Sequence, residues 1–292
     1  MTHDIKRTKD ANGENFPVGS CLIPAKLRPH VMAFYDYART ADDVADSDLP
    51  RMEKLRRLDA LEAVLRGLRD ADEDTKCAET LRNSLEETGV TNQHALDLLK
   101  AFRQDAVGFT YKTWEDVMAY CRNSAGSVGR YMLDLHGENP SAYWPSDALC
   151  AALQLNNHLQ DCQDDYQNRQ RVYIPRDWFS DEKIKYEALS DSITCDALRR
   201  VFDRMAAAID SLLVESSPLP LVIRHRGLRM EVCVIYRLAQ RLLKKLKKRD
   251  ILKRKIALEK TDWVLAGTRG ILDGLTRKKI KCLKKQDLLP PK

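Results

Sequence analysis

Two aspartates separated by four residues, Asp42 and Asp46, stand in the segment RTADDVAD at positions 39–46. In a helix this spacing places both carboxylates on one face, with their Cβ atoms about 5–6 Å apart. Arg39 lies one turn before Asp42, and Tyr35 lies one turn before Arg39. One helix face therefore presents a tyrosine, an arginine and two acids in succession.

A second face of this kind occurs much later in the chain, in QLNNHLQDCQDDYQNRQRVYIP at positions 154–175. Asn157, Asp161 and Asp165 are spaced i, i+4, i+8. Gln154 lies one turn before Asn157, and Arg171 follows the acids. Leucines interleaved with these polar residues indicate that the same helix is buried on part of its surface.

The spacing leaves two interpretations open, a solvated acidic surface and a cation site. The apolar neighbours favour the second, because burying an unpaired carboxylate costs several kcal/mol. Carboxylate and amide oxygens suit Mg²⁺, which usually shares its coordination shell with water and substrate phosphate. Two such helices with arginines nearby indicate a diphosphate held by Mg²⁺.

The remaining sequence predicts helices, because apolar residues recur with helical periodicity and strand signals are nearly absent. We expect a single all-α domain of about nine helices across residues 1–292. The clearest predicted helices are at 25–46, 51–68, 95–109, 114–136, 144–168, 195–214, 219–246 and 260–285.

Composition indicates a soluble globular protein, with 43% hydrophobic and 32% charged residues. No apolar run approaches the ~20 residues of a membrane span, and the N-terminal residues lack a secretory signal, so we expect a cytoplasmic protein. None of the eight cysteines forms a C-x-x-C pair, which argues against a zinc site. The net charge of +6 owes much to basic runs within 237–285. A solvated helix face and attraction to an anionic membrane both explain these runs better than nucleic-acid binding, because aromatics do not interleave with the basic residues.

The two acidic motifs resemble those of the squalene/phytoene synthase family. The first matches Y-x-x-x-R-x-x-D-D-x-x-D from Tyr35 to Asp46, and the second matches Q-L-x-N-x-x-x-D-x-x-x-D followed by R-x-Y-[IL]-P. The resemblance covers about residues 14–267, with a basic C-terminal helix and tail after it. It implies an isoprenoid synthase-type helical bundle around a central prenyl-chain cavity.

Within this family the chain is most similar to the bacterial hydroxysqualene synthases of hopanoid biosynthesis. The segments ENFPVGS, AFRQD, TWEDVMAYCRNSA and NNHLQDC carry that similarity. One position departs from that branch, since Ser127 stands where it usually has proline. This departure favours the presqualene and phytoene branches.

The resemblance implies a set of site residues. The metal ligands and catalytic acids are Asp42, Asp46, Asp161 and Asp165, with Asn157 as a further metal ligand for two or three Mg²⁺ ions. The substrate-binding residues are Phe16, Tyr35, Arg39, Ala125, Gly126, Gln154, Arg171 and Tyr236. Close helix packing for Gly126 and a core position for Tyr236 are the alternatives. Asp105 is considered as the residue that directs water, with an ordinary surface carboxylate as its alternative.

The implied reaction converts presqualene diphosphate and water to hydroxysqualene and diphosphate. It needs no nicotinamide cofactor, and the sequence has no Gly-rich dinucleotide loop to hold one. The alternatives are condensation of two prenyl diphosphates and a non-catalytic assembly role. The expected partners are a prenyl diphosphate, other hopanoid-pathway enzymes for hand-over, and the inner face of an anionic membrane at its periphery, but no nucleic acid.

Overall fold

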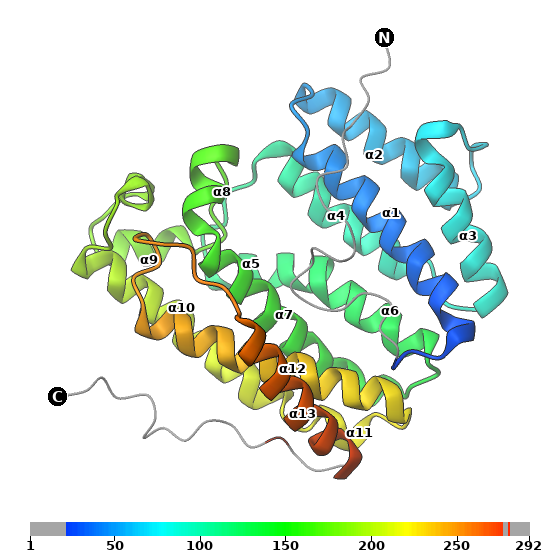
Figure 1. The fold of residues 1–292 in the computed structure, drawn as a ribbon. Helices are drawn as coiled ribbons and strands as arrows, with labels where there is room; N and C mark the ends of the chain where they lie inside the picture. The colour runs from blue at the N-terminus through cyan, green and yellow to red at the C-terminus, as the bar shows by residue number, and fades with distance from the viewer. Residues whose placement is uncertain (1–21, 277–279, 281–292) are drawn as a thin grey trace.

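The computed structural model describes residues 22–276 and residue 280, and within them every regular element is a helix (Figure 1). The α-helices are α1 (Arg28–Asp46), α2 (Arg51–Leu65), α3 (Lys76–Thr88), α4 (Gln93–Val107), α5 (Trp114–Cys121), α6 (Ser127–Leu135), α7 (Tyr143–Gln160), α8 (Cys162–Arg169), α9 (Arg176–Asp181), α10 (Asp196–Ser216), α11 (Leu219–Val222), α12 (Arg226–Lys248) and α13 (Lys260–Thr276). The expected all-α class is confirmed.

Three of the predicted helices are interrupted. The range 114–136 contains α5, a π-helical turn η4 (Arg122–Gly126) and α6. The range 144–168 changes direction at Asp161, which ends α7 and precedes α8, and the range 219–246 divides into α11 and α12. Helices α3 and α9 were not among the predicted ranges. Most of 277–285, predicted as helical, lies outside the described residues.

Two hydrophobic clusters make up the core. One is built from α1 to α4 with part of α6, and includes Phe34 and Leu99. The other is built mainly from α5, α7, α10 and α12, and includes Leu155 and Tyr236. In Figure 1, α1 to α4 lie apart from α10, α12 and α13, with α6 and α7 between them. Any cavity between the two clusters is therefore bordered by α1 on one side and by α7 and α12 on the other.

Helix α1 places its apolar and charged residues on different faces. Val31, Phe34, Ala41 and Val44 are separated by three or seven residues, which places them on one face, and they are buried in the first cluster. Ser47 follows the helix, and its hydroxyl donates to the Val44 carbonyl at 2.8 Å. Because the apolar face of α1 packs into the first cluster, its charged face is directed away from that cluster, toward other elements of the molecule.

The π-helical turn is stabilised by a side chain of α7. Gln154 accepts a hydrogen bond at Oε1 from the Ala125 backbone N–H at 3.2 Å, and its Nε2 donates to Ser124 Oγ at 2.9 Å. Such turns widen a helix locally and are frequent at functional sites. Here a polar side chain from a distant helix satisfies backbone and hydroxyl groups of the turn.

Candidate active site

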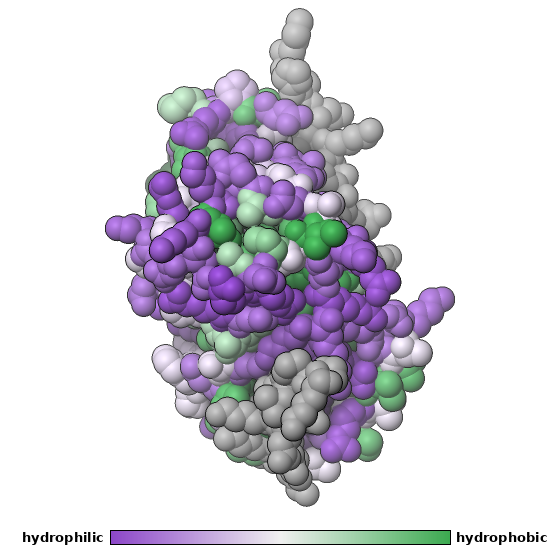
Figure 2. Space-filling view, turned by 90° about the vertical axis from the view of Figure 1, so that its left-hand side faces the viewer, coloured by the Kyte–Doolittle hydropathy of each residue, from purple (hydrophilic) through white to green (hydrophobic). Residues whose placement is uncertain are grey.

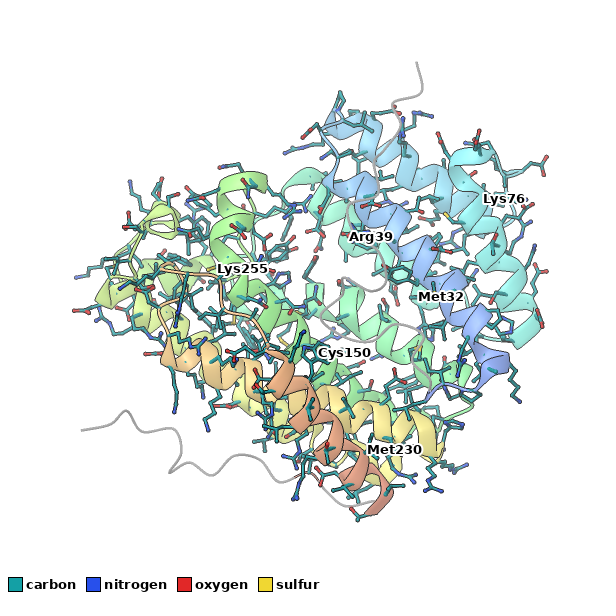
Figure 3. The ribbon with its side chains drawn as sticks, viewed as in Figure 1. Met32, Arg39, Lys76, Cys150, Met230 and Lys255 are labelled. Carbon is teal, nitrogen blue, oxygen red and sulfur yellow. The ribbon has the colours of Figure 1, made fainter. Side chains whose placement is uncertain are left out.

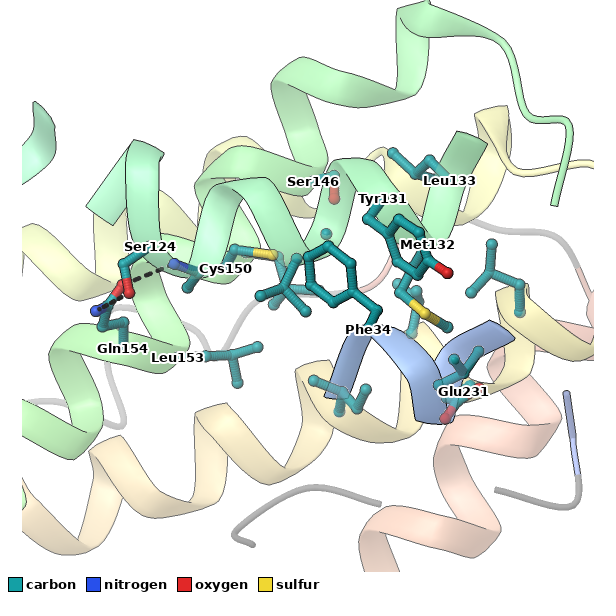
Figure 4. A pocket seen from close by; sticks show the side chains of 18 of the residues that line it. Phe34, Ser124, Tyr131, Met132, Leu133, Ser146, Cys150, Leu153, Gln154 and Glu231 are labelled. Carbon is teal, nitrogen blue, oxygen red and sulfur yellow. Dashed lines mark hydrogen bonds between the residues drawn. The ribbon is translucent and has the colours of Figure 1, made fainter. Parts of the chain in front are cut away.

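A cavity of about 450 Å³ lies between the two hydrophobic clusters. Its wall is mostly apolar and comes from α1, the η4–α6 segment, α7 and α12. Figure 4 shows Gln154 and Ser124 at one end of this cavity, with Met132, Leu133 and Glu231 at the other. A volume in this range suits a small-molecule ligand, and an apolar wall suits a hydrocarbon.

Stacked aromatic rings form part of the wall. The rings of Phe34 on α1 and Tyr131 on α6 are 4.0 Å apart between centroids, and Tyr131 donates its hydroxyl to the His30 carbonyl at 2.8 Å. Gly129 lies on the same wall, and a Cβ atom there would be 2.5 Å from Cys150 Sγ. The glycine therefore lets α6 approach α7 closely.

The cavity leads along two helices toward the acidic residues. Tyr35 on α1 and Asn157 on α7 both line it. Tyr35 lies one turn before Arg39, and Asn157 lies one turn before Asp161. The apolar chamber and the charged residues are thus continuous along α1 and α7.

The two acidic motifs meet through arginines. Arg171 Nη1 donates to Asp46 Oδ1 at 2.5 Å, and its Nη2 donates to the Ala45 carbonyl at 2.9 Å. Arg169 lies between the motifs, 3.2 Å from Asp46 Oδ2 and 3.2 Å from Asp165 Oδ1. Asp46 of the first motif and Asp165 of the second therefore share one guanidinium group.

Arg39 neutralises the other acids of the first motif. Its guanidinium donates to Asp42 at 2.9 Å and to Asp43 at 2.8 Å. Burial and the nearby charge of Asp46 raise the pKa of Asp42 to about 7, although Arg39 opposes the shift. Burial likewise raises the pKa of Asp165 to about 6 against the pull of Arg169. These carboxylates are costly to ionise without further positive charge.

Lys255 reaches the second motif from the segment between α12 and α13. Its Nζ is 3.3 Å from Asp161 Oδ1 and 3.5 Å from Asp164 Oδ2, and Asp161 is the main cause of its raised pKa. Figure 3 labels Arg39 on α1 and Lys255 beside α8, so the two basic residues come from different elements. Figure 2 looks onto the end of the molecule where α8 and α9 lie, and most of that surface is hydrophilic.

A buried acid lies close to this ionic site. Asp105 on α4 accepts hydrogen bonds from Tyr120 at 2.8 Å and from Tyr173 at 2.7 Å. Burial raises its pKa to about 6, while Arg171 and the two tyrosine hydroxyls lower it. The interpretation of Asp105 as a surface carboxylate is wrong, since only 7% of the residue is exposed.

The site fits a magnesium ion by the chemistry of its donors, which are carboxylate and amide oxygens. Among the described residues, no three acids, histidines or cysteines come together as a ready metal site. An ion there would therefore complete its shell with water or with oxygens of a bound diphosphate, as Mg²⁺ commonly does. In this structure the acids instead form ion pairs with Arg169, Arg171 and Lys255.

Most of the expected site residues that the structure describes lie at the cavity or at the ionic site. The cavity is lined by Tyr35, Ala125, Gln154 and Asn157. The ionic site contains Arg39, Asp42, Asp46, Asp161, Asp165 and Arg171. Phe16 lies outside the described residues.

Two expected substrate contacts are placed elsewhere. Tyr236 is fully buried in the second hydrophobic cluster, and its hydroxyl donates to the Leu213 carbonyl at 2.7 Å. This bond joins α12 to α10 within the core, which is the position that the alternative for Tyr236 describes. Gly126 does not line the cavity, and a Cβ atom there would be 3.3 Å from the Cys121 carbonyl oxygen. Its packing alternative describes the observed position.

Four features of the site were not predicted from the sequence. Lys255 belongs to a basic run that was interpreted only as a surface feature, and Arg169 was given no role. Tyr120 and Tyr173 were quoted within motifs, but nothing local indicated that both hydroxyls meet Asp105. Glu231 lines the cavity from α12 and sits in an otherwise apolar stretch that carried no signal.

Comparison with known proteins defines the class. The squalene/phytoene synthase family matches residues 10–262, and the chain belongs to this family of prenyl diphosphate-using synthases. It is 41% identical to a hydroxysqualene synthase of Rhodopseudomonas palustris over 94% of both chains. It is 40% identical to a hydroxysqualene synthase of Sinorhizobium fredii, over 91% of this chain and 90% of the other. The expected similarity to that branch is confirmed.

Solved structures agree on the fold. The squalene synthase HpnC of Alicyclobacillus acidocaldarius superposes with a TM-score of 0.68 and 27% identity, over 79% of this chain and 87% of its own. A dehydrosqualene synthase solved with a ligand gives a TM-score of 0.76 at 22% identity, over 91% and 93%. The isoprenoid synthase-type helical bundle is therefore confirmed.

Proposed function

We propose that this protein converts presqualene diphosphate and water to hydroxysqualene and diphosphate in a Mg²⁺-dependent reaction. The observation that carries the proposal is an apolar cavity that leads along α1 and α7 into clustered acids and arginines. The hydrocarbon would occupy the cavity, and its diphosphate would lie among the charges. The curated relatives named hydroxysqualene synthases support the same reaction.

Loss of diphosphate is the first chemical requirement. The carbon–oxygen bond breaks, and its electron pair leaves on the diphosphate, whose growing charge must be neutralised. Bound Mg²⁺, of which we expect two or three ions, would supply Lewis-acid stabilisation there, held by Asp42, Asp46, Asn157, Asp161 and Asp165.

Basic residues would act on the same leaving group. Arg169, Arg171 and Lys255 now form ion pairs with these acids, and they would be free to contact the diphosphate if metal took their place at the carboxylates. Arg39, on the face that Tyr35 shares, would orient the diphosphate at the mouth of the cavity. Each of these groups stabilises negative charge that is greatest after the bond breaks, which is what acceleration requires.

Addition of water is the second requirement. The water oxygen forms a bond to the carbocation and must lose a proton. We assign this role to Asp105, whose pKa of about 6 suits a base at neutral pH. Tyr120 and Tyr173 hold its carboxylate in place. The apolar wall would exclude other water from the cation.

Incubating the purified chain with Mg²⁺ and presqualene diphosphate, followed by mass analysis of the lipids, tests the proposal. Hydroxysqualene is the expected product. If presqualene diphosphate remains unchanged, the proposal is wrong.

Head-to-head condensation of two prenyl diphosphates is the second candidate, because Ser127 replaces the proline usual in the hydroxysqualene branch. Ser127 is buried, and its hydroxyl donates to the Ser124 carbonyl at 2.7 Å, next to the π-helical turn. Incubation with farnesyl or geranylgeranyl diphosphate would produce presqualene diphosphate, squalene or phytoene under this candidate. A non-catalytic assembly role predicts no calorimetric binding of Mg²⁺ with diphosphate.

The proposed product is an apolar alcohol, which must pass to a membrane or to a following enzyme of hopanoid synthesis. We propose that residues 1–292 form one domain. We also propose that the protein is cytoplasmic and makes peripheral contact with the inner face of the membrane. The basic runs in 237–285 support this location through attraction to anionic lipid.

A further inference from the structure

Helix α13 carries its large apolar side chains on the outside. Its inner face packs on α12 through Ala266, Gly270 and Gly274, which are all buried. A Cβ atom at Gly270 would be 2.5 Å from the Cα atom of Val234, so the two helices are in close contact. Small residues therefore occupy the face where a soluble helix usually buries its large ones.

The opposite face forms an exposed apolar stripe of five residues. The stripe consists of Val264, Leu265, Ile271, Leu272 and Leu275, which are between 39% and 66% exposed. At 100° per residue these side chains fall within about one third of the helix circumference, where the only other residues are threonines. An exposed apolar face that is continuous in this way marks an interaction surface.

Basic residues border the stripe and indicate the kind of partner that it binds. Lys260 and Arg269 are exposed at its two edges. In the sequence directly after α13, six of the nine residues at 277–285 are lysine or arginine. An apolar stripe with basic borders is complementary to a lipid surface that combines hydrocarbon and negative charge.

A second copy of the chain fits this surface less well. Two copies meeting at α13 would bring their basic borders together, which is unfavourable. Five side chains are also few, since stable interfaces use about 20–30 residues on each side.

We propose that the outer face of α13 binds an anionic membrane surface, with the stripe inserted among the lipids. The helix would lie in the plane of the surface rather than cross it, because it has 17 residues and carries charges at Asp262, Arg269 and Asp273. The segment of the described chain that is long and apolar enough to cross a membrane is 196–222, and half of its 18-residue apolar window is buried inside the molecule.

This location would bring the membrane close to the cavity. Val232 and Ile235 of α12 line the cavity, and Val234 between them in sequence contacts α13. The two packed helices α13 and α12 therefore separate the stripe from the apolar chamber. The membrane-binding surface is inferred from the side chains of α13. Its test therefore does not depend on which prenyl diphosphate the enzyme uses.

Flotation of the full chain with vesicles tests the proposal. Wild type is expected to bind phosphatidylglycerol–phosphatidylcholine vesicles at low salt, and phosphatidylcholine vesicles much less. The triple variant Val264→Ser, Leu265→Ser, Leu272→Ser should lower binding about tenfold or more. The matched control Met52→Ser, Leu68→Ser removes two apolar side chains on or next to α2 that are 75% and 77% exposed, and should bind as wild type does.

Thermal melting and calorimetric binding of Mg²⁺ with inorganic diphosphate establish that the variants are folded. Wild type that fails to bind anionic vesicles overturns the proposal, and so does a folded triple variant that binds like wild type. A dimer in ultracentrifugation that only the triple variant disrupts, without vesicle binding, overturns it in favour of a second copy. Loss of vesicle binding with unchanged product formation from a dispersed substrate supports the membrane role separately from the reaction.

Discussion

Replacing the buried Asp105 by asparagine should have opposite effects on stability and on catalysis. The ordinary pKa of an aspartate, 3.8, rises to about 6 at this position because of burial. At about 1.4 kcal/mol per pH unit, ionising Asp105 in the folded protein costs about 3 kcal/mol more than in the unfolded chain. Because asparagine is neutral at every pH, the variant avoids this cost.

The sign of the effect depends on pH. A raised folded-state pKa stabilises the fold fully below the unfolded value of 3.8, and this contribution is lost as pH rises through about 6. At pH 8 the avoided cost of about 3 kcal/mol should make the Asp105→Asn variant more stable than wild type, and the weaker pairing of its amide with two tyrosine hydroxyls reduces this gain to about 1–3 kcal/mol. At pH 4 the avoided cost nearly vanishes and only the pairing loss remains, so the variant should be equal to wild type or less stable by up to about 2 kcal/mol.

Urea unfolding of the metal-free protein at pH 4 and pH 8 measures this difference. In the same variant, formation of hydroxysqualene should fall about 10²–10⁴-fold if Asp105 accepts the proton from water. Tyr173→Phe serves as the control, because it removes one hydrogen bond and keeps the carboxylate. A variant that is clearly less stable than wild type at pH 8 would refute the electrostatic reasoning, and unchanged hydroxysqualene formation would refute the catalytic role.

Three further predictions concern the ionic site and the cavity wall. Lys255→Ala should raise the affinity for Mg²⁺ alone about two- to fivefold in calorimetry, because an exposed ion pair with Asp161 contributes about 0.2–1 kcal/mol; the exposed neighbour variant Lys253→Ala should leave it unchanged. Affinity for Mg²⁺ should fall as pH drops below about 7, where Asp42 takes up a proton, and a flat profile in wild type would contradict this. Gly129→Ala should destabilise the protein by about 1–3 kcal/mol in urea unfolding, since its new methyl group meets Cys150 Sγ, and Cys150→Ala should restore part of the loss. An unchanged urea midpoint for Gly129→Ala would show that α6 and α7 can separate without cost.

Local periodicity was sufficient for most of the helices and for both acidic motifs, because the first motif lies on α1 and the second on α7 and α8. It did not predict α3, α9 or the breaks within three of the ranges. It could not show that Arg169 joins Asp46 to Asp165, since that contact depends on how α1 and α8 pack. The π-helical turn was missed for the same reason, because Gln154 stabilises it from a distant helix. Tyr236 was placed among the substrate-binding residues through the family resemblance, with a core position as its alternative, and its bond to the Leu213 carbonyl depends on how α12 and α10 pack.

Helix α7 touches both the hydrocarbon chamber and the ionic site with one continuous row of side chains. From Ser146, through Cys150 and Gln154, to Asp161 the row spans about 22 Å at 1.5 Å per residue. A hydrocarbon tail too bulky for the chamber would push on the same helix that ends at Asp161, a residue that we propose as a metal ligand. A substrate with too bulky a tail would then undergo slower bond breaking, while its binding affinity would change little.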